Sequence, residues 1–331
     1  MIDGSLTMSF HSLNYPSYIL SHVNTHKTLS KARMNPVLAI PPSSVVLHAD
    51  ESGNFHEPKK ISGLMRSDSS DSLLSQENTV GIIGGISANS NVNFLRKLVQ
   101  WSSKAGQDSL PFVLCSDPVL SKELLLHERN SFTSLGRQNE NFQLDHTKIV
   151  ENLRGKRVFL ERSGARCIVM PCHISHSWHD EASKGCSVHF LHMGECVARE
   201  LKEAKLKPLE AGSPLRIGLL ATNAILSAGF YQEKLQSEGF EVVLPDKATM
   251  DHTVIPAIDP LNRKDIEGAR NLLRIALQFL LVRAVNIVIL ASDDIIDLLP
   301  QDDPLLKKCI DPIDALARST IKWAEAAENG T

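Results

Sequence analysis

A chain of 331 residues with a net charge of −3 and 22% charged residues lacks the basic character of a nucleic-acid-binding protein. Its apolar runs are far shorter than the ~20 residues that span a bilayer, so no membrane partner is expected. The six cysteines lack the regular spacing of a small secreted scaffold, which predicts reduced thiols in an intracellular enzyme. These features favour work on a small molecule.

The N-terminal quarter differs from the rest of the chain. Between residues 1 and 49 the only acidic residue is Asp3, while serines recur among Lys27, Lys31 and Arg33. This composition is typical of an organelle transit peptide, and the Ser-rich stretch 66–78 resembles a disordered linker. We predict a transit peptide and linker over residues 1–78 and a chloroplast location. The alternative is a disordered N-terminal tail that carries no targeting signal, with a cytoplasmic location.

After residue 78 short apolar runs alternate with helical patterns. The run 79–85 is β-branched and closed by glycines, and apolar residues then recur at helical spacing from Phe94 to Val99. Further strands are predicted at 111–117, 167–171 and 188–193. After the Pro- and Gly-containing stretch 206–214 a second cycle begins, with strands expected at 216–223, 241–245 and 286–294. The alternation predicts an α/β fold with two similar parallel-sheet halves.

Ligands of such sheets bind outside the carboxyl ends of the strands. This rule selects the turns after Gly84, Cys115, Pro171, Ala221 and Leu290. At the first turn the glycines do not fit a dinucleotide fingerprint. A helix that starts near Ala88 still offers free backbone N–H groups to a carboxylate. A plain connection between strand and helix is the alternative.

Cys172 follows a predicted strand and is succeeded by His173, His176 and His179. Neighbouring histidines and helix N-termini lower a thiol pKa from its usual value of about 8.5, which suits a thiol that abstracts protons. An inert buried cysteine is the alternative. A zinc site that adds His189, His192 or Cys186 ranks last, because the spacing matches no standard structural site. At 292–294 the sequence Ser-Asp-Asp suits either an active site or a helix cap.

Several motifs together resemble the aspartate/glutamate racemase family, the cofactor-independent amino-acid racemases, here as a plant-type member. They are VGIIGGIS, SDP, IVMPCHISH, LLATN with GFYQEKL, and VILASDD, in the family's order. The resemblance implies two pseudo-symmetric, three-layer α/β domains, 79–207 plus 310–331 and 213–309, with an interdomain cleft. It also implies that the last strand and helix return to the first domain, that the protein is a homodimer, and that no cofactor or metal is used.

The resemblance assigns Cys172 as the first catalytic cysteine, between the family's Pro171 and His176. His173 stands where the family has asparagine. In the second motif Ser292 replaces the second catalytic cysteine, and Asp293 follows it. In the family two thiols flank Cα, one removing a proton and the other delivering one to the opposite face.

Other positions carry expected roles in substrate binding or support. Ser116 belongs to a Ser-Asn-Pro-like segment, and Lys122 with Glu123 stands where the family has an arginine for the substrate's side-chain carboxylate. The predicted catalytic residues are Cys172 and Ser292. The predicted supporting residues are Gly85, Ser87, Ser116, Lys122, His173, His176, Thr222, Asn223 and Asp293.

The leading hypothesis is a PLP-independent amino-acid racemase-like isomerase of the aspartate/glutamate racemase type. Cys172 works on one face of Cα and Ser292, assisted or replaced by His173, on the other. Its small-molecule partner is an amino acid or a related carboxylate. One alternative is a one-thiol relative that catalyses decarboxylation or cis-trans isomerisation. Another is a catalytically inactive homologue that binds a ligand.

Overall fold

The computed structural model describes residues 78–106, 110–133, 146–208, 212–259 and 264–329. All of them belong to one compact unit, Asp68–Thr331. The predicted transit peptide and all but the last residue of the predicted linker lie outside the described residues. Within the described ranges no helix has the length and apolar character needed to cross a membrane.

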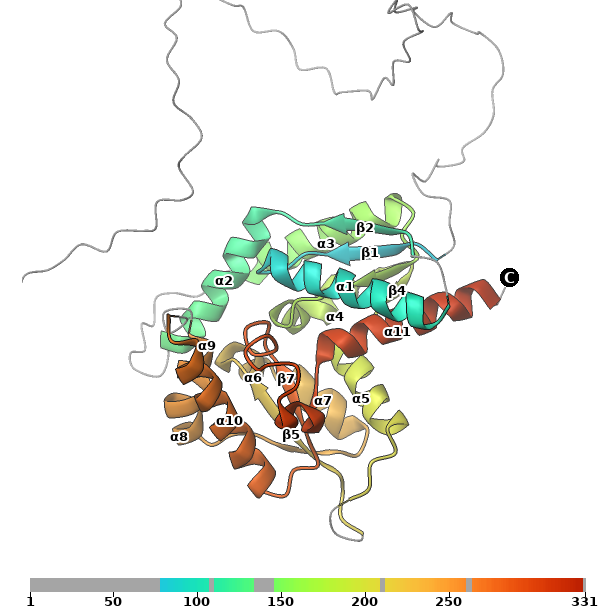
Figure 1. The fold of residues 1–331 in the computed structure, drawn as a ribbon. Coiled ribbons are helices and arrows are strands. Elements are labelled where there is room, and N and C mark those ends of the chain that lie inside the picture. Colours follow the sequence, from blue (N-terminus) through green and yellow to red (C-terminus); the bar gives the residue numbers. More distant parts are fainter. Residues whose placement is uncertain (1–77, 107–109, 134–145, 209–211, 260–263, 330–331) are drawn as a thin grey trace, which may run out of the picture. The chain divides into compact units, whose positions relative to one another are not determined.

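Two four-stranded sheets carry the fold (Figure 1), as the alternation of apolar runs predicts. The strand orders are β2-β1-β3-β4 and β6-β5-β7-β8, and every pairing is parallel. The α/β class with two parallel sheets is therefore confirmed. The strands are β1 (Val80–Ile83), β2 (Phe112–Cys115), β3 (Cys167–Val169), β4 (His189–Phe190), β5 (Arg216–Ala221), β6 (Glu241–Val243), β7 (Ile287–Ala291) and β8 (Cys309–Ile310).

Helices connect these strands and cover the sheets. The longer ones are α1 (Ala88–Lys104), α2 (Pro118–Thr133), α3 (His146–Arg162), α5 (Met193–Glu203), α7 (Phe230–Ser237), α10 (Ile266–Val282) and α11 (Pro312–Asn329). The shorter ones are α4 (His179–Ser183), α6 (Asn223–Ala228), α8 (Lys247–Thr249), α9 (Ile255–Ile258), the 3₁₀ turns η2 (Ile174–Trp178) and η5 (Pro304–Lys308), and the π-helical turn η3 (Met250–Val254).

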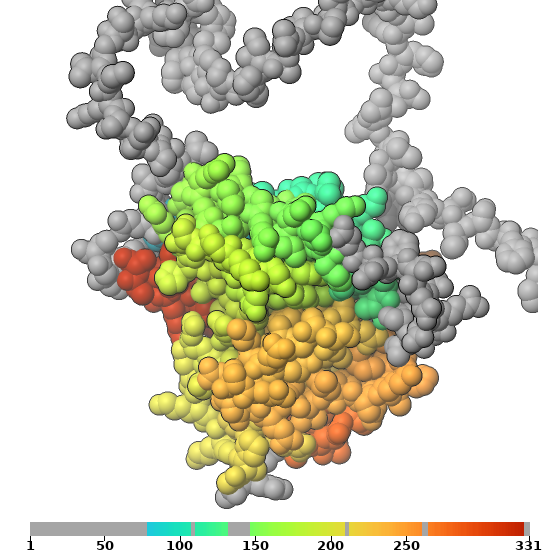
Figure 2. All heavy atoms as spheres, turned by 180° about the vertical axis from the view of Figure 1, so that it is seen from behind, coloured from blue at the N-terminus to red at the C-terminus, as the bar shows by residue number. Residues whose placement is uncertain are grey.

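Burial explains the composition of the strands. Every residue of β1 is buried, because parallel strands at the centre of a sheet are covered on both faces. β2 lies at the edge of its sheet, and its Phe112 and Leu114 are 42% and 39% exposed. One apolar cluster includes residues of both sheets, such as Ile168 of β3 and Ile289 of β7. Figure 2 shows green segments of the first half in direct contact with orange segments of the second.

The end of the chain departs from the expectation. β8 pairs with β7 in the register Val288↔Cys309 and Ile289↔Ile310, so the expectation that the last strand returns to the first domain is wrong. This pairing satisfies backbone groups that the free edge of β7 would otherwise leave open. The last helix does return: α11 packs against α1 and α5, and Figure 1 shows α11 alongside α1. The two domain boundaries themselves stay a prediction.

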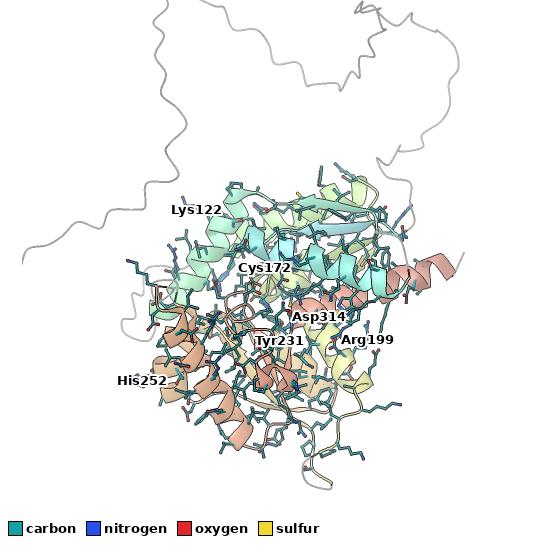
Figure 3. The ribbon with its side chains drawn as sticks, in the orientation of Figure 1. Lys122, Cys172, Arg199, Tyr231, His252 and Asp314 are labelled. Carbon is teal, nitrogen blue, oxygen red and sulfur yellow. The ribbon has the colours of Figure 1, made fainter. Side chains whose placement is uncertain are left out.

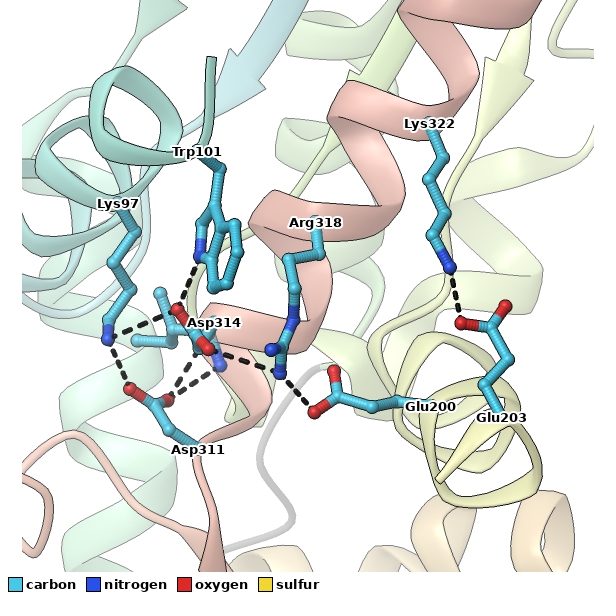
Figure 4. Close-up of polar contacts among 9 residues, drawn as sticks. Lys97, Trp101, Glu200, Glu203, Asp311, Asp314, Arg318 and Lys322 are labelled. Carbon is cyan, nitrogen blue, oxygen red and sulfur yellow. Dashed lines mark hydrogen bonds and ion pairs between the residues drawn. The ribbon is translucent and has the colours of Figure 1, made fainter. Parts of the chain in front are cut away.

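A polar network ties α11 to α1 (Figure 4). The Trp101 indole donates to Asp314 Oδ1 at 2.7 Å, and Lys97 Nζ lies 2.7 Å from Asp311 Oδ2. Arg318 pairs with Asp314 at 3.1 Å and lies over the Trp101 ring. Asp314 is the centre of this network, because it contacts the Trp101 indole, Arg318 and, at 3.7 Å, Lys97.

We expect Asp314→Ala to lower the free energy of unfolding by about 1–3 kcal/mol, because it leaves the Trp101 indole N–H without its acceptor and removes one of the two carboxylates that Lys97 and Arg318 each contact. Lys322→Ala is the matched control from the same helix. Lys322 pairs with Glu203 where both side chains are about half exposed, and such pairs contribute about 0–1 kcal/mol. Urea unfolding of both variants measures the difference. Equal losses would contradict the central role of Asp314.

Candidate active site

The predicted catalytic residues lie at the carboxyl ends of two central strands. Cys172 follows β3, and Ser292 and Asp293 follow β7. Cys172, His173 and Ser292 are 0%, 1% and 3% exposed, so the predicted cleft is closed over them in this structure. The apolar cluster that spans both sheets accounts for this closure. In Figure 3 Cys172 and Tyr231 lie in the interior of the molecule.

Gly85 allows the turn after β1 to approach Cys172. A Cβ at position 85 would lie 2.0 Å from Cys172 Cβ and 2.4 Å from Sγ, which no side chain tolerates. The close approach lets the backbone N–H of Ile86 donate to Cys172 Sγ at 3.5 Å. The glycine turn therefore serves the thiol, while the predicted binding of a carboxylate by its backbone N–H groups stays a prediction.

Burial, followed by the negative charge of Asp293, raises the pKa of Cys172 to about 12, although the Ile86 N–H and Ser175 act in the opposite direction. The expectation that neighbouring histidines lower this pKa is wrong. Burial also lowers the pKa of His173 to about 3, so His173 is neutral and supplies no positive charge. At neutral pH the resting Cys172 is a thiol that can deliver a proton.

His173 is held by one side-chain hydrogen bond from the second half of the chain. Its Nδ1 lies 2.9 Å from the Tyr231 hydroxyl, which lies 3.0 Å from Met193 Sδ. On its other side Nε2 lies 3.6 Å from Asp293 Oδ1, too far for a hydrogen bond. Both of these facing atoms are buried and lack a hydrogen-bond partner.

The Asp293 carboxyl group lies among other carboxyl groups. Burial raises its pKa to about 7; Ser90 counteracts the shift, and the charges of Glu128, Asp311 and Asp297 add to it. Because the folded protein holds this proton more tightly than the unfolded chain does, the contribution of Asp293 to stability falls as pH rises from about 4 to about 7.

We therefore expect Asp293→Asn, which has no proton to lose, to be more stable than the wild type above pH 7. A shift from 3.8 to about 7, at about 1.4 kcal/mol for each pKa unit, corresponds to about 4 kcal/mol, and screening at the 22% exposed side chain reduces the expected gain to about 2–4 kcal/mol. The two proteins should converge below pH 4. Thermal unfolding of both from pH 4 to 8 measures the gap. Parallel curves would contradict the raised pKa.

The remaining histidines of the Cys172 motif have structural contacts. His176 Nε2 lies 2.9 Å from the Met170 carbonyl oxygen, which closes the turn around Cys172. The His176 ring stacks on His179 and lies near His192, with ring centroids 5.7 Å and 5.1 Å away. Across the described ranges no three His, Cys, Asp or Glu side chains are arranged to hold a metal ion. These histidines pack ring against ring.

Three other predicted supporting residues cap a helix, pack against the glycine turn or face solvent. The Ser87 hydroxyl caps α1 by accepting from the Asn89 N–H at 3.0 Å. Ser116 lies against the other glycine of the turn: a Cβ on Gly84 would be 2.4 Å from its Oγ. Lys122 is exposed on α2 and points outward, away from Cys172 (Figure 3). The structure does not bring Lys122 to the site.

The second half contributes Thr222, Asn223 and Ser292. Thr222 lies beside Glu128, whose pKa is raised by burial and lowered in part by the Thr222 hydroxyl. Asn223 Nδ2 is buried without a hydrogen-bond partner. Ser292 Oγ accepts from the Asp294 N–H at 3.3 Å, the geometry of a turn cap. The structure thus brings Cys172, His173 and Asp293 together, with Ser292 beside them in sequence.

Comparison with known proteins shows the family of the chain. The Asp/Glu/Hydantoin racemase family matches residues 83–320, well over half of the chain. The chain belongs to this family. The match includes Cys172 and Ser292 and ends within α11, so it covers both sheets of the racemase fold.

Individual relatives of this racemase-family chain are distant. The aspartate racemase of Picrophilus torridus is 26% identical with a TM-score of 0.56, and the alignment covers 75% of this chain and 94% of that one. An aspartate racemase homologue from Pyrococcus horikoshii is 19% identical with a TM-score of 0.58, over 75% and 99% of the two chains. The broad-specificity amino-acid racemase RacX of Bacillus subtilis is 26% identical over 103 residues, 31% of this chain and 41% of RacX.

The racemase-family site contains residues that the sequence analysis did not assign. Tyr231 bonds to His173 and to Met193, and Ser90 and Glu128 influence the pKa of Asp293. Tyr231 lies in the GFYQEKL motif and Ser90 in the helix after the glycine turn, so their motifs were visible but their roles were not. Glu128 lies on α2, and no pattern in the sequence around it indicates a role in the site.

Proposed function

We propose that this protein is a PLP-independent amino-acid racemase-like isomerase of the aspartate/glutamate racemase type, with Cys172 as an acid/base at Cα. The observation that carries the proposal is the setting of Cys172. The thiol is fully buried at the end of β3, receives the Ile86 N–H, and lies near Asp293 from the other sheet. A dry site of this kind protects a carbanion from water and strengthens electrostatic contacts with it.

Charge at the site favours an amino acid as the substrate. Cys172, Asp293 and Glu128 all have raised pKa values, because each becomes anionic on losing its proton and burial opposes that charge. A substrate ammonium group supplies the missing positive charge and lowers the cost of ionising these groups. A carboxylate without an amine offers no such compensation.

The residues expected near the substrate's side chain favour a substrate whose side chain is not acidic. Position 123, near which the family has its arginine, is glutamate, and Lys122 points into solvent. Glu128 and Asp293 add negative potential instead. The relative RacX is a broad-specificity amino-acid racemase, which agrees with a substrate range beyond aspartate and glutamate.

For the second face of Cα we propose Ser292, assisted or replaced by His173. Removal of a proton by one group and delivery by another on the opposite face inverts the configuration. Ser292 Oγ accepts a backbone N–H, and a serine hydroxyl needs a base to act. This contact favours, as the second candidate, a one-thiol enzyme that exchanges the proton on one face only.

The test incubates the full chain in D2O with each enantiomer of aspartate, glutamate, lysine and alanine. Proton NMR follows the loss of Cα–H, and chiral chromatography follows the enantiomers. Exchange with inversion is the expected result, with faster turnover of lysine or alanine than of the acidic pair. Exchange with retention supports the one-thiol enzyme. Neither exchange nor inversion would overturn the isomerase proposal.

We further propose a homodimer and a chloroplast location. The family resemblance supports the first, and the composition of residues 1–49 supports the second. Analytical ultracentrifugation and fluorescent fusion of the full chain test them.

A further inference from the structure

His173 and Asp293 form a facing pair from the two sheets. His173 follows the first family motif's cysteine and Asp293 follows Ser292. His173 Nε2 and Asp293 Oδ1 are 3.6 Å apart, and both are buried without a hydrogen-bond partner. Burying two polar atoms without hydrogen bonds is costly. A proton on either atom, or a donor group between them, would satisfy both.

The contacts of Tyr231 are compatible with a proton on His173 Nδ1. When the Tyr231 hydroxyl donates to Met193 Sδ at 3.0 Å, its oxygen is free to accept from His173 Nδ1–H at 2.9 Å. In this tautomer of the neutral imidazole, Nε2 carries a lone pair on the side of Asp293. Two acceptors face each other unless the Asp293 carboxyl is protonated or has just taken a proton from a substrate.

We propose that the Asp293 carboxyl, oriented by the Nε2 lone pair of His173, is the acid/base group that works opposite Cys172, and that Ser292 only caps its turn. This inference rests on the proposed function and replaces its second-face group. Asp293 follows a strand of the other sheet yet is close enough for its charge to act on Cys172. A carboxyl group takes up and releases a proton near neutral pH far more readily than a serine hydroxyl does.

The proton balance closes with the two groups in opposite states. The Asp293 carboxylate takes the Cα proton, and the electron pair of the broken C–H bond stays on Cα, delocalised into the substrate carboxylate. The Cys172 S–H bond breaks and its proton forms a new Cα–H bond on the other face. The products are a carboxylic acid at Asp293 and a thiolate at Cys172. The reverse reaction begins from that state, and proton exchange with water after product release restores the resting one.

The test measures which enantiomer each variant exchanges in D2O. Asp293→Asn should lower racemisation about a hundredfold while Cys172 still exchanges Cα–H of one enantiomer with retention. Cys172→Ala should exchange only the opposite enantiomer. Asp294→Asn, the matched control that removes the adjacent, exposed carboxylate, should keep racemisation within about threefold. Asp293→Glu, which keeps a carboxyl group, should retain more racemisation than Asp293→Asn.

Each other pattern overturns the inference. If Ser292→Ala loses inversion while Asp293→Asn keeps it, Ser292 is the second acid/base. If Asp293→Asn and Cys172→Ala exchange the same enantiomer, both groups work on one face. If Asp293→Asn, shown to be folded by its Tm, exchanges neither enantiomer, Asp293 serves binding. If the wild type neither exchanges nor inverts any substrate, the proposed function fails and this inference with it.

Discussion

Cys172→Ala is expected to lower racemisation about a thousandfold while the protein remains folded. The thiol is the group that delivers or removes a proton on its face of Cα, and such catalysis contributes about 10²–10⁴-fold. Burial raises the pKa of Cys172 to about 12, which keeps it protonated and ready to donate. Cys172→Ser should lower racemisation to a similar degree, because a hydroxyl of nearly the same size is a much weaker acid than a thiol. Chiral chromatography of the product measures both.

Cys167→Ala is the matched control. Cys167 is 0% exposed in β3, five residues before Cys172, and burial raises its pKa as well. Its loss creates a similar small cavity, which costs stability but removes no acid/base group. We expect near wild-type turnover at a temperature where both variants are folded. Equal loss of activity in the two would show that cavity formation, not chemistry, explains the effect of Cys172→Ala.

Much of the fold was predictable because it depends on local patterns. Parallel strands buried on both faces need continuous apolar runs, and seven such runs fall on β1–β7. The rule that ligands bind at carboxyl strand ends placed Cys172 and Ser292 at the ends of β3 and β7. Gly85 was identified from the turn, and the structure supplies the reason in its contact with Cys172.

The polar geometry of the site was not predictable, since it depends on residues far apart in sequence. His173 suggested an imidazolium that would lower the pKa of Cys172, but complete burial keeps it neutral. Its bond to Tyr231 joins residues separated by 58 positions, which no local pattern reveals. Lys122 stands next to Glu123 at the family's arginine position, yet it faces solvent on α2. The pairing of β8 with β7 was also missed, because a two-residue strand has no period.

Gly85→Ala is expected to reduce both stability and activity. The new Cβ would lie 2.0 Å from Cys172 Cβ and 2.4 Å from Sγ, so the turn after β1 or the end of β3 must shift. Overpacking of a buried site costs about 1–3 kcal/mol. A displacement of about 1 Å at a reacting group lowers turnover about a hundredfold. Urea unfolding and racemisation assays of the variant measure the two losses.

Two comparisons separate this clash from the general effect of adding a methyl group. Gly155 lies on α3 with nothing within 4 Å of an added Cβ, so Gly155→Ala should raise the free energy of unfolding by about 0.5–1 kcal/mol. The double variant Gly85→Ala with Cys172→Gly moves a Cβ from one side of the contact to the other. Because it removes the overlapping atoms, it should be more stable than the sum of the two single changes implies. Simple additivity would mean that the turn after β1 yields freely, and Gly85 would then not be what sets the position of the Cys172 thiol.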